Sequence, residues 1–173
     1  MKHLYPLFTF ILALLTACAP ESQTSSIQAT AAASTYFPIS VGDQILELQL
    51  ALNPSEQNKG LMHRDSMKED HGMLFLFKQP QPRAFWMRNT RIPLDIGYFD
   101  ANGSLLEIHA LYPYDENTVK SRSQAVQIAV ETNRGWFARN QITAGAQIDL
   151  DALAHAIRAR GQSPANFSIQ NAE

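Results

Sequence analysis

A basic stretch around a tryptophan is the part of the sequence best suited to bind a ligand. In an extended strand, Trp86 and Arg88 share one face, so the guanidinium can lie over the indole ring. Arginine also binds carboxylates and phosphates through paired hydrogen bonds. Four basic residues occur here with no acidic residue among them: Lys78, Arg83, Arg88 and Arg91. We therefore predict a site for a small polar or anionic ligand (a carboxylate, phosphate or sugar), formed by Arg64, Trp86, Arg88, Asn89, Thr90, Asp95 and Glu131.

A structural interpretation of the same residues stays open. Trp86 could cap the core, and Arg88 could pair with an acidic side chain. Asn89 and Thr90 have the residue types of a turn, because their side chains bond nearby backbone groups. Polar groups at strand ends commonly satisfy local backbone in this way.

Asp95 and Glu131 also suggest a catalytic pair, in which one carboxyl acts as acid and the other as base. Nothing in their spacing brings them together, and Arg64 or Arg88 could instead hold either one in an ion pair. The sequence carries no nucleophile-elbow motif. A hydrolase using Asp95 and Glu131 is therefore an alternative to a non-enzymatic binding module, and enzymatic activity is left open.

A second alternative is a copper site. Thioether and imidazole ligands suit Cu(I), and methionines and histidines alternate between residues 62 and 87. Several of these methionines stand beside Leu and Phe, where methionine fills core gaps. The candidate ligands outside such contexts are His63, Met67 and His71. No other cofactor is predicted.

The amino terminus has the features of a lipoprotein signal. Residues 1–17 contain Lys2 and then a short apolar run, which is too short to span a bilayer. The run ends in Leu-Thr-Ala before Cys18, the only cysteine, and this resembles a bacterial lipobox. That resemblance implies cleavage before Cys18 and its acylation, giving a stable membrane anchor. Ala19 resembles the pattern of proteins sent to the outer membrane, facing the periplasm.

The segment from Cys18 to residue 36 is rich in Ser, Thr, Ala and Gln, which predicts a flexible tether after the lipidated cysteine. The formal net charge of −2 argues against nucleic acid as a partner, because such proteins need a basic surface. The predicted partners are the membrane, through the anchor, and a small ligand or another envelope protein.

The elements that must position these residues are short. Alternating or continuous apolar patterns predict strands at 44–51, 73–77, 84–88, 94–99, 104–111, 125–132 and near 147. Capping signals predict helices at 54–60, 135–140 and 149–160. The predicted fold class is α+β: one compact domain with a mainly antiparallel sheet, open or partly closed into a barrel-like form, and short peripheral helices.

Several ordered phrases carry a family resemblance. They are Gly60-Leu-Met62 with Arg64, Gly72-Met-Leu-Phe75, Phe85-Trp-Met-Arg-Asn-Thr90, Pro93-Leu-Asp95, and Val130-Glu131 with Gly135. Together they resemble the family called domain of unknown function 192. The resemblance implies an α+β domain, often exported, whose activity is not established. The domain is expected over residues 37–148, followed by an extension at 149–173 consisting of a helix and a disordered tail.

Overall fold

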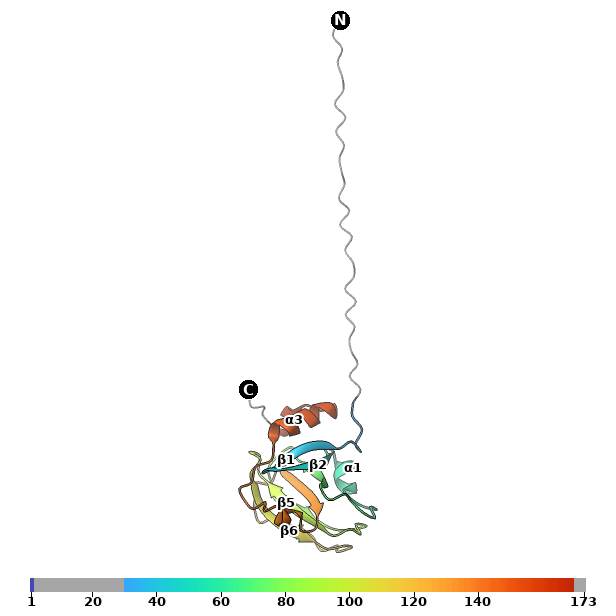
Figure 1. Cartoon of the computed structure of the whole chain (residues 1–173), viewed down its shortest axis with the longest axis vertical. Helices are drawn as coiled ribbons and strands as arrows, with labels where there is room; N and C mark the ends of the chain where they lie inside the picture. Colours follow the sequence, from blue (N-terminus) through green and yellow to red (C-terminus); the bar gives the residue numbers. More distant parts are fainter. Residues whose placement is uncertain (2–29, 170–173) are drawn as a thin grey trace.

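A six-stranded sheet forms the centre of the molecule (Figure 1). The computed structural model describes Met1 and residues 30–169. The strand order is β1-β2-β3-β8-β5-β6, and the bounds are β1 (Phe37–Val41), β2 (Gln44–Ala51), β3 (His71–Leu76), β8 (Ile128–Asn133), β5 (Leu94–Phe99) and β6 (Leu105–Leu111). Neighbouring strands are antiparallel except for the parallel pair β2 and β3.

Smaller elements surround this sheet. A second sheet pairs β4 (Ala84–Phe85) with β7 (Val119–Lys120). The helices of the described residues are α1 (Pro54–Lys59), α2 (Trp136–Arg139), α3 (Leu150–Ala159) and a 3-10 helix (Pro164–Phe167). The mainly sheet α+β class is therefore confirmed. The barrel-like alternative is not supported, because β1 and β6 end the sheet and do not pair with each other.

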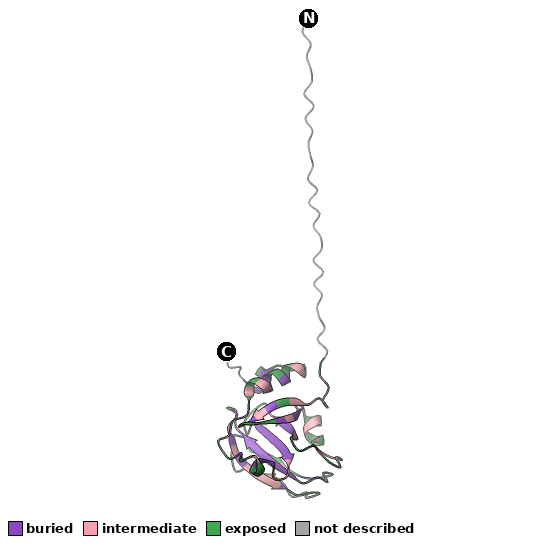
Figure 2. Ribbon diagram, in the orientation of Figure 1, coloured by how far each residue is buried: buried purple, intermediate pink, exposed green. Residues whose placement is uncertain are grey.

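Both faces of the sheet are covered, so its strands are buried along most of their length (Figure 2). One face, here called the helix face, includes Leu74, Phe99 and Val130, and it packs with residues of α2 and α3. The other, here called the loop face, includes Tyr98 and Ala129, and it packs with loop residues such as Met87. A strand buried on both faces is predicted by a continuous apolar run, as found in β3.

Most predicted elements form where expected. The Asn53 side chain caps α1 by accepting from the Glu56 N–H at 3.0 Å. The β5–β6 hairpin turns through Gly103, whose φ of 79° is in the left-handed region. Two strands are much shorter than predicted, namely the one expected at 84–88 and the last one, near 147. The strand expected at 84–88 ends at Phe85, because Met87 N donates to Asp115 O and the chain then turns.

The last predicted strand is reduced to isolated bridges, Val41 with Ile148 and Ser104 with Gln147.

The carboxy-terminal extension is part of the core rather than a tail. Leu153 and Ile157 of α3 are fully buried and belong to the helix-face core. Phe167 and Ile169 are also buried, so residues 161–169 are not the disordered tail expected after the helix. The sequence prediction missed this because the apolar residues after Gly161 are widely spaced among polar ones.

The tether also ends earlier than predicted. Residues 30–36 lie against the domain: Ala31 N donates to Ala159 O at 2.7 Å, and the Gln49 side chain donates to Ser34 O at 2.7 Å. Cys18 and most of the predicted tether lie outside the described residues.

Truncation tests the role of the extension. In a chain without residues 1–18, ending the protein at Asp149 removes four large buried side chains (Leu153, Ile157, Phe167 and Ile169) from the helix-face core. Each is worth roughly 1.5–3 kcal/mol, so we expect the domain to lose more than about 4 kcal/mol in urea unfolding or to become insoluble. Ending the chain at Ile169 is the matched control and should change stability by less than about 0.5 kcal/mol. Equal stability of the two truncated proteins would contradict this assignment.

Candidate ligand-binding cleft

A cleft of about 280 Å³ opens on the loop face, between α1 and the segment 82–90. Gln57 to Met62 form one wall, and Pro82 to Trp86 form the other. Phe75, Phe77 and Glu131 come from the sheet side, and Thr90 completes the lining. Three of the predicted site residues therefore line one cleft: Trp86, Thr90 and Glu131.

Backbone hydrogen bonds hold the loops that flank the cleft. His63 N donates to Asn89 O at 2.9 Å, which joins the loop after α1 to the loop after β4. Thr90 N donates to Met87 O, and Tyr114 N donates to Thr90 O, each at 3.0 Å. Asn89 has a φ of 54°, a conformation that asparagine adopts more readily than most residues. Asn89 thus shapes the turn, as the structural interpretation expected, and its side chain is exposed.

Glu131 is the distinctive group of the cleft. It lies on the central strand β8 and is only 5% exposed. No hydrogen bond or ion pair reaches its carboxyl group from residues 30–169, although buried carboxyl groups are normally paired. Burial raises the pKa of Glu131 to about 8, and the positive charge of Arg64 opposes this rise. The side chain is therefore largely protonated at neutral pH.

Arg64 does not form an ion pair with Glu131, because other groups already bind its guanidinium. Gln49, Met73 and Glu131 stand opposite one another on β2, β3 and β8. The Arg64 guanidinium donates to the Gln49 side chain and to the Tyr36 hydroxyl, the latter at 2.9 Å. Gln49 and Tyr36 thus bind the Arg64 guanidinium, and no hydrogen bond or ion pair joins it to Glu131. The arginine acts on the acid through space only.

Trp86 stands at the rim of the cleft with 44% of its surface exposed. The Arg88 guanidinium lies 5.4 Å from the centre of its ring, so the predicted contact forms although the strand ends at Phe85. Arg83 lies 3.6 Å over the Phe77 ring, and its buried Nε has no hydrogen-bond partner among the described residues. Burial lowers the pKa of Arg83. Arg91 instead pairs with Asp65 at 2.5 Å, so the four basic residues do not form one continuous patch.

Asp95 does not belong to the cleft. It pairs with Thr132, whereas the adjacent Glu131 pairs with Ile96, so the two acids project from opposite faces of the sheet. Asp95 accepts a hydrogen bond from Gly135 N at 2.7 Å and lies 3.2 Å from the Arg134 Nε. These contacts give it a structural role at the start of α2, and its partner is not Arg88. The structure therefore separates the two carboxyls that the hydrolase alternative would combine.

The three candidate copper ligands are not gathered around one point by any contact described here. The His71 ring packs on Tyr36 with ring centres 4.3 Å apart, and the His63 side chain is exposed. Met67 is partly buried against the loop-face core. Among residues 30–169 there is no group of three His, Cys, Asp or Glu residues suited to a metal ion. This absence does not concern methionine ligands, so a thioether-based Cu(I) site stays a prediction.

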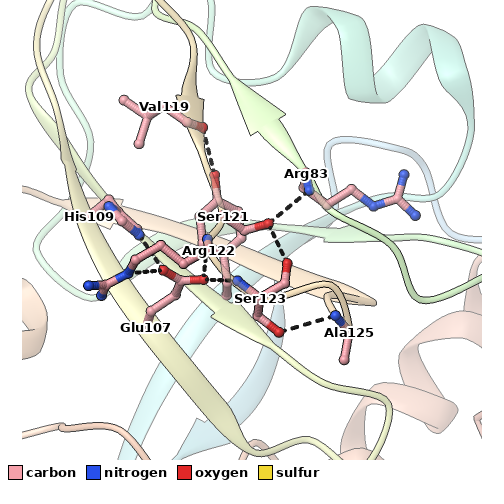
Figure 3. Close-up of polar contacts among 9 residues, drawn as sticks. Arg83, Glu107, His109, Val119, Ser121, Arg122, Ser123 and Ala125 are labelled. Atoms are coloured by element: carbon pink, nitrogen blue, oxygen red, sulfur yellow. Dashed lines mark hydrogen bonds and ion pairs between the residues drawn. The ribbon is translucent and has the colours of Figure 1, made fainter.

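A second polar cluster on the loop face centres on Glu107 (Figure 3). Its carboxylate accepts from the N–H groups of Arg122 and Ser123, at 2.8 and 2.9 Å. It also lies 2.7 Å from His109 Nε2 and 3.0 Å from Arg122 Nε. Burial alone would raise the pKa of Glu107, but these hydrogen bonds, led by Ser123, outweigh it and lower the pKa to about 2.

Sequence reasoning missed this cluster. The spacing of Glu107 and His109 was a usable signal, since residues two apart on a strand share a face. Ser121 closes the cluster: its hydroxyl accepts from Arg83 N and donates to Ser123 O (Figure 3). Both carboxylate oxygens of Glu107 are hydrogen-bonded within this chain, so the cluster holds the loop before β8 against β6.

Tyr98 lies between the two acids on the same face. Its hydroxyl donates to Val119 O at 3.1 Å. Burial, then the charges of Glu131 and Glu107, raise the pKa of Tyr98. The tyrosine therefore stays a neutral donor and ties β7 to the sheet.

Comparisons with known proteins identify the family of this chain. The family model of DUF192, described as an uncharacterized ACR, matches residues 37–150. The chain belongs to the DUF192 family. The match includes the whole cleft and ends where α3 begins, so most of the carboxy-terminal extension lies outside the family model. A comparison with curated proteins finds no match.

Two solved structures are similar to this DUF192 chain. One is a candidate transcription regulator from Sinorhizobium meliloti 1021, with 32% identity and a TM-score of 0.64, covering 66% of this chain and 95% of that one. The other is a protein of unknown function from Novosphingobium aromaticivorans DSM 12444, with 31% identity and a TM-score of 0.64, covering 72% and 94%. Within the described residues of this chain, no helix is long and apolar enough to cross a membrane.

Replacing Glu131 by glutamine tests the burial of its carboxyl. A glutamate with a folded pKa of about 8 holds its proton more tightly than the unfolded chain, where the pKa is near 4.5. Its contribution to stability is therefore complete below pH 4.5 and is lost as pH rises to about 8. We expect Glu131→Gln to match the wild type near pH 5 and to melt several degrees higher near pH 8.5.

Thermal unfolding across this pH range measures the difference. Glu116→Gln, in an exposed loop, is the matched control and should follow the wild-type curve. A constant difference between Glu131→Gln and the wild type from pH 5 to 8.5 would mean that the carboxyl is not protonated by burial.

Proposed function

We propose that this DUF192 protein is a non-enzymatic binding module whose cleft around Glu131 takes a small polar ligand. One observation carries the proposal. The Glu131 side chain is only 5% exposed and lines an open cleft. No group of residues 30–169 forms a hydrogen bond with its carboxyl. An unpaired buried carboxyl costs free energy, so a polar ligand in the cleft would recover part of that cost.

The charges of the lining favour an uncharged or anionic ligand. A protonated Glu131 offers one O–H donor and one carbonyl acceptor, and it does not repel an anion. Gln57 donates through its amide nitrogen to Leu76 O at 2.9 Å, and its carbonyl oxygen has no partner among the described residues. Lys59 and Arg83 add positive charge to the walls. Trp86 supplies a flat apolar surface at the rim.

Binding is a better interpretation of this cleft than hydrolysis. Glu131 is the one acidic side chain among its described lining residues. General acid–base hydrolysis by paired carboxyls needs a second acid within several ångströms on the same side, and Asp95 occupies the opposite face. We therefore keep Asp95 as a structural residue and Glu131 as a ligand-binding residue.

We further propose that the module is held in the cell envelope by a lipid on Cys18. The support is the Leu-Thr-Ala-Cys sequence after a short apolar run at the amino terminus. Residues 19–29 would then separate the anchor from the domain, which begins to pack at residue 30. The outer membrane, with the domain in the periplasm, is the proposed location, and an envelope protein could be a further partner.

The transcription-regulator description of one structural relative is not carried over to this chain. Sequence-specific or general DNA binding requires clustered positive charge. The chain has 16 acidic against 14 Lys and Arg residues. Within the described residues, Arg91, Arg122, Arg134, Arg139 and Arg160 are each engaged with a carboxylate.

A ligand screen tests the cleft. The chain contains two tryptophans, and Trp136 is fully buried on the helix face, so a fluorescence change on binding should report Trp86. We expect at least one compound from a panel of sugars, carboxylates and phosphates to change this fluorescence and to raise the melting temperature. Glu131→Ala should weaken that binding by about tenfold or more, whereas Glu131→Gln, which mimics the protonated acid, should largely retain it at pH 7.

Two controls accompany the screen. Trp86→Phe should remove the fluorescence change while leaving the thermal shift. Asp95→Asn should leave ligand affinity unchanged once its loss of stability is accounted for. Binding that ignores Glu131 but depends on Asp95 would overturn the assignment.

Metabolic labelling tests the anchor. In a bacterial host that lipidates exported proteins, the full-length chain should incorporate labelled palmitate and fractionate with the outer membrane. Cys18→Ala should abolish both the label and the membrane association, because no other cysteine is available for acylation. A labelled Cys18→Ala protein, or an unlabelled wild type, would refute the lipobox interpretation.

A further inference from the structure

Three adjoining clefts follow α1 along the surface. The second, of about 350 Å³, shares Gln57, Phe77 and Arg83 with the Glu131 cleft. The third, of about 310 Å³, shares Lys59 and Gly60 with it. The Glu131 cleft therefore lies in the middle of a longer groove, which runs from Gln79 and Phe167 in the second cleft to Ser34 and Arg64 in the third.

The dimensions of the groove suggest a ligand with several similar units. Each cleft has a volume of about 300 Å³, the lower end of the range for small-ligand sites, and so accommodates roughly one ring. A single compact ligand would leave two of the three clefts empty. A short chain of rings would occupy all three while contacting α1 throughout.

The lining of the groove matches hydroxyl-rich rings. Uncharged amides recur along it, namely Gln57, Asn58, Gln79 and Gln81, whereas the Gln49 amide is already bound by Ser34 and Arg64. An amide both donates and accepts, as does a sugar hydroxyl. The exposed Trp86 offers a flat surface for the apolar C–H face of a sugar ring. The second cleft has Lys78 beside Arg83, and the third has Glu56 beside Lys59 and Arg64, so positive charge accompanies the amides along the groove.

Unpaired polar atoms lie at the centre of the groove and at its first junction. The Nε of Arg83 is buried without a partner among the described residues, and Arg83 lines both the Glu131 cleft and the second cleft. The Glu131 carboxyl is unpaired in the middle cleft. The Glu131 carboxyl thus remains available to a ligand in the middle cleft, whereas the Arg83 Nε has almost no accessible surface to offer one.

We propose that the ligand is an oligosaccharide of about three sugar units, lying against α1 with its middle ring between Glu131 and Trp86. This inference rests on the proposed binding function and specifies its substrate class. An uncharged extended peptide would need backbone partners, and the described lining offers mainly side-chain amides and aromatic rings.

Calorimetric titration of the full-length chain in detergent with saccharides of one to four units tests the proposal. The probes are β-1,4-linked N-acetylglucosamine, β-1,4-linked glucose and α-1,4-linked glucose. In at least one series, affinity should rise by about tenfold or more from one unit to three and then level off. The double variant Gln79→Ala with Gln81→Ala should weaken binding of the three-unit sugar by about tenfold and leave the single sugar within about twofold.

Gln44→Ala, on an exposed position of β2 outside the groove, is the matched control and should change neither affinity. Affinity that does not grow with chain length, or no binding in any series, would overturn the oligosaccharide inference. If another compound of the ligand screen then binds in a Glu131-dependent way, the proposed binding function stands without it. A tri-alanine peptide that binds as tightly as the three-unit sugar would also overturn the inference.

Discussion

The position of β8 at the centre of the sheet is the constraint on which the rest of the structure depends. The strand is hydrogen-bonded to β3 on one side and to β5 on the other, and both of its faces are covered. Residues 128–132 are all buried, so any polar side chain there must be satisfied within the protein or by a bound molecule. Gly72 on β3 allows β3 and β8 to pack this closely, because a Cβ at position 72 would collide with the Glu131 carbonyl oxygen.

The buried polar side chains of the two faces find partners in different ways. On the helix face, Thr132 and its cross-strand neighbour Asp95 lie near the start of α2, where Asp95 receives a backbone N–H. That face is sealed by α3, in which Leu153 and Ile157 are fully buried. Arg160 follows α3 and donates to Leu50 O and to Glu56, which connects the extension to α1. On the loop face the described helix is α1, which has no buried side chain, and the cleft beside it stays open.

Sequence patterns predicted the elements well where one local signal decides the structure. Alternation placed β2, the hairpin of β5 and β6, and the apolar face of α3, while Asn53 and Pro54 fixed the start of α1. The patterns could not predict strand order, and strand order decides which side chains meet. Asp95 and Glu131 looked equivalent as isolated acids, yet register places them on opposite faces.

The same limit explains the parts of the site that were found and missed. Trp86, Thr90 and Glu131 belong to phrases that carry the family resemblance, and the structure brings them together. Gln57 and Phe77 carry no chemical signal in the sequence, and they meet in the cleft because the Gln57 side chain donates to Leu76 O at the end of β3. Gln127 is another such case: it is fully buried and reaches the Phe167 carbonyl from 40 residues away.

The contrast between Glu107 and Glu131 separates a structural acid from one available to a ligand. Both are buried, and both lie on the loop face near Tyr98. Glu107 is surrounded by donors from residues 109, 122 and 123, which lower its pKa to about 2 and leave it no free capacity. Glu131 has a nearby arginine, but Gln49 and Tyr36 already bind the Arg64 guanidinium. Because the arginine whose charge acts on Glu131 is bound by other groups, the hydrogen-bonding capacity of this carboxyl stays available to a ligand in the cleft.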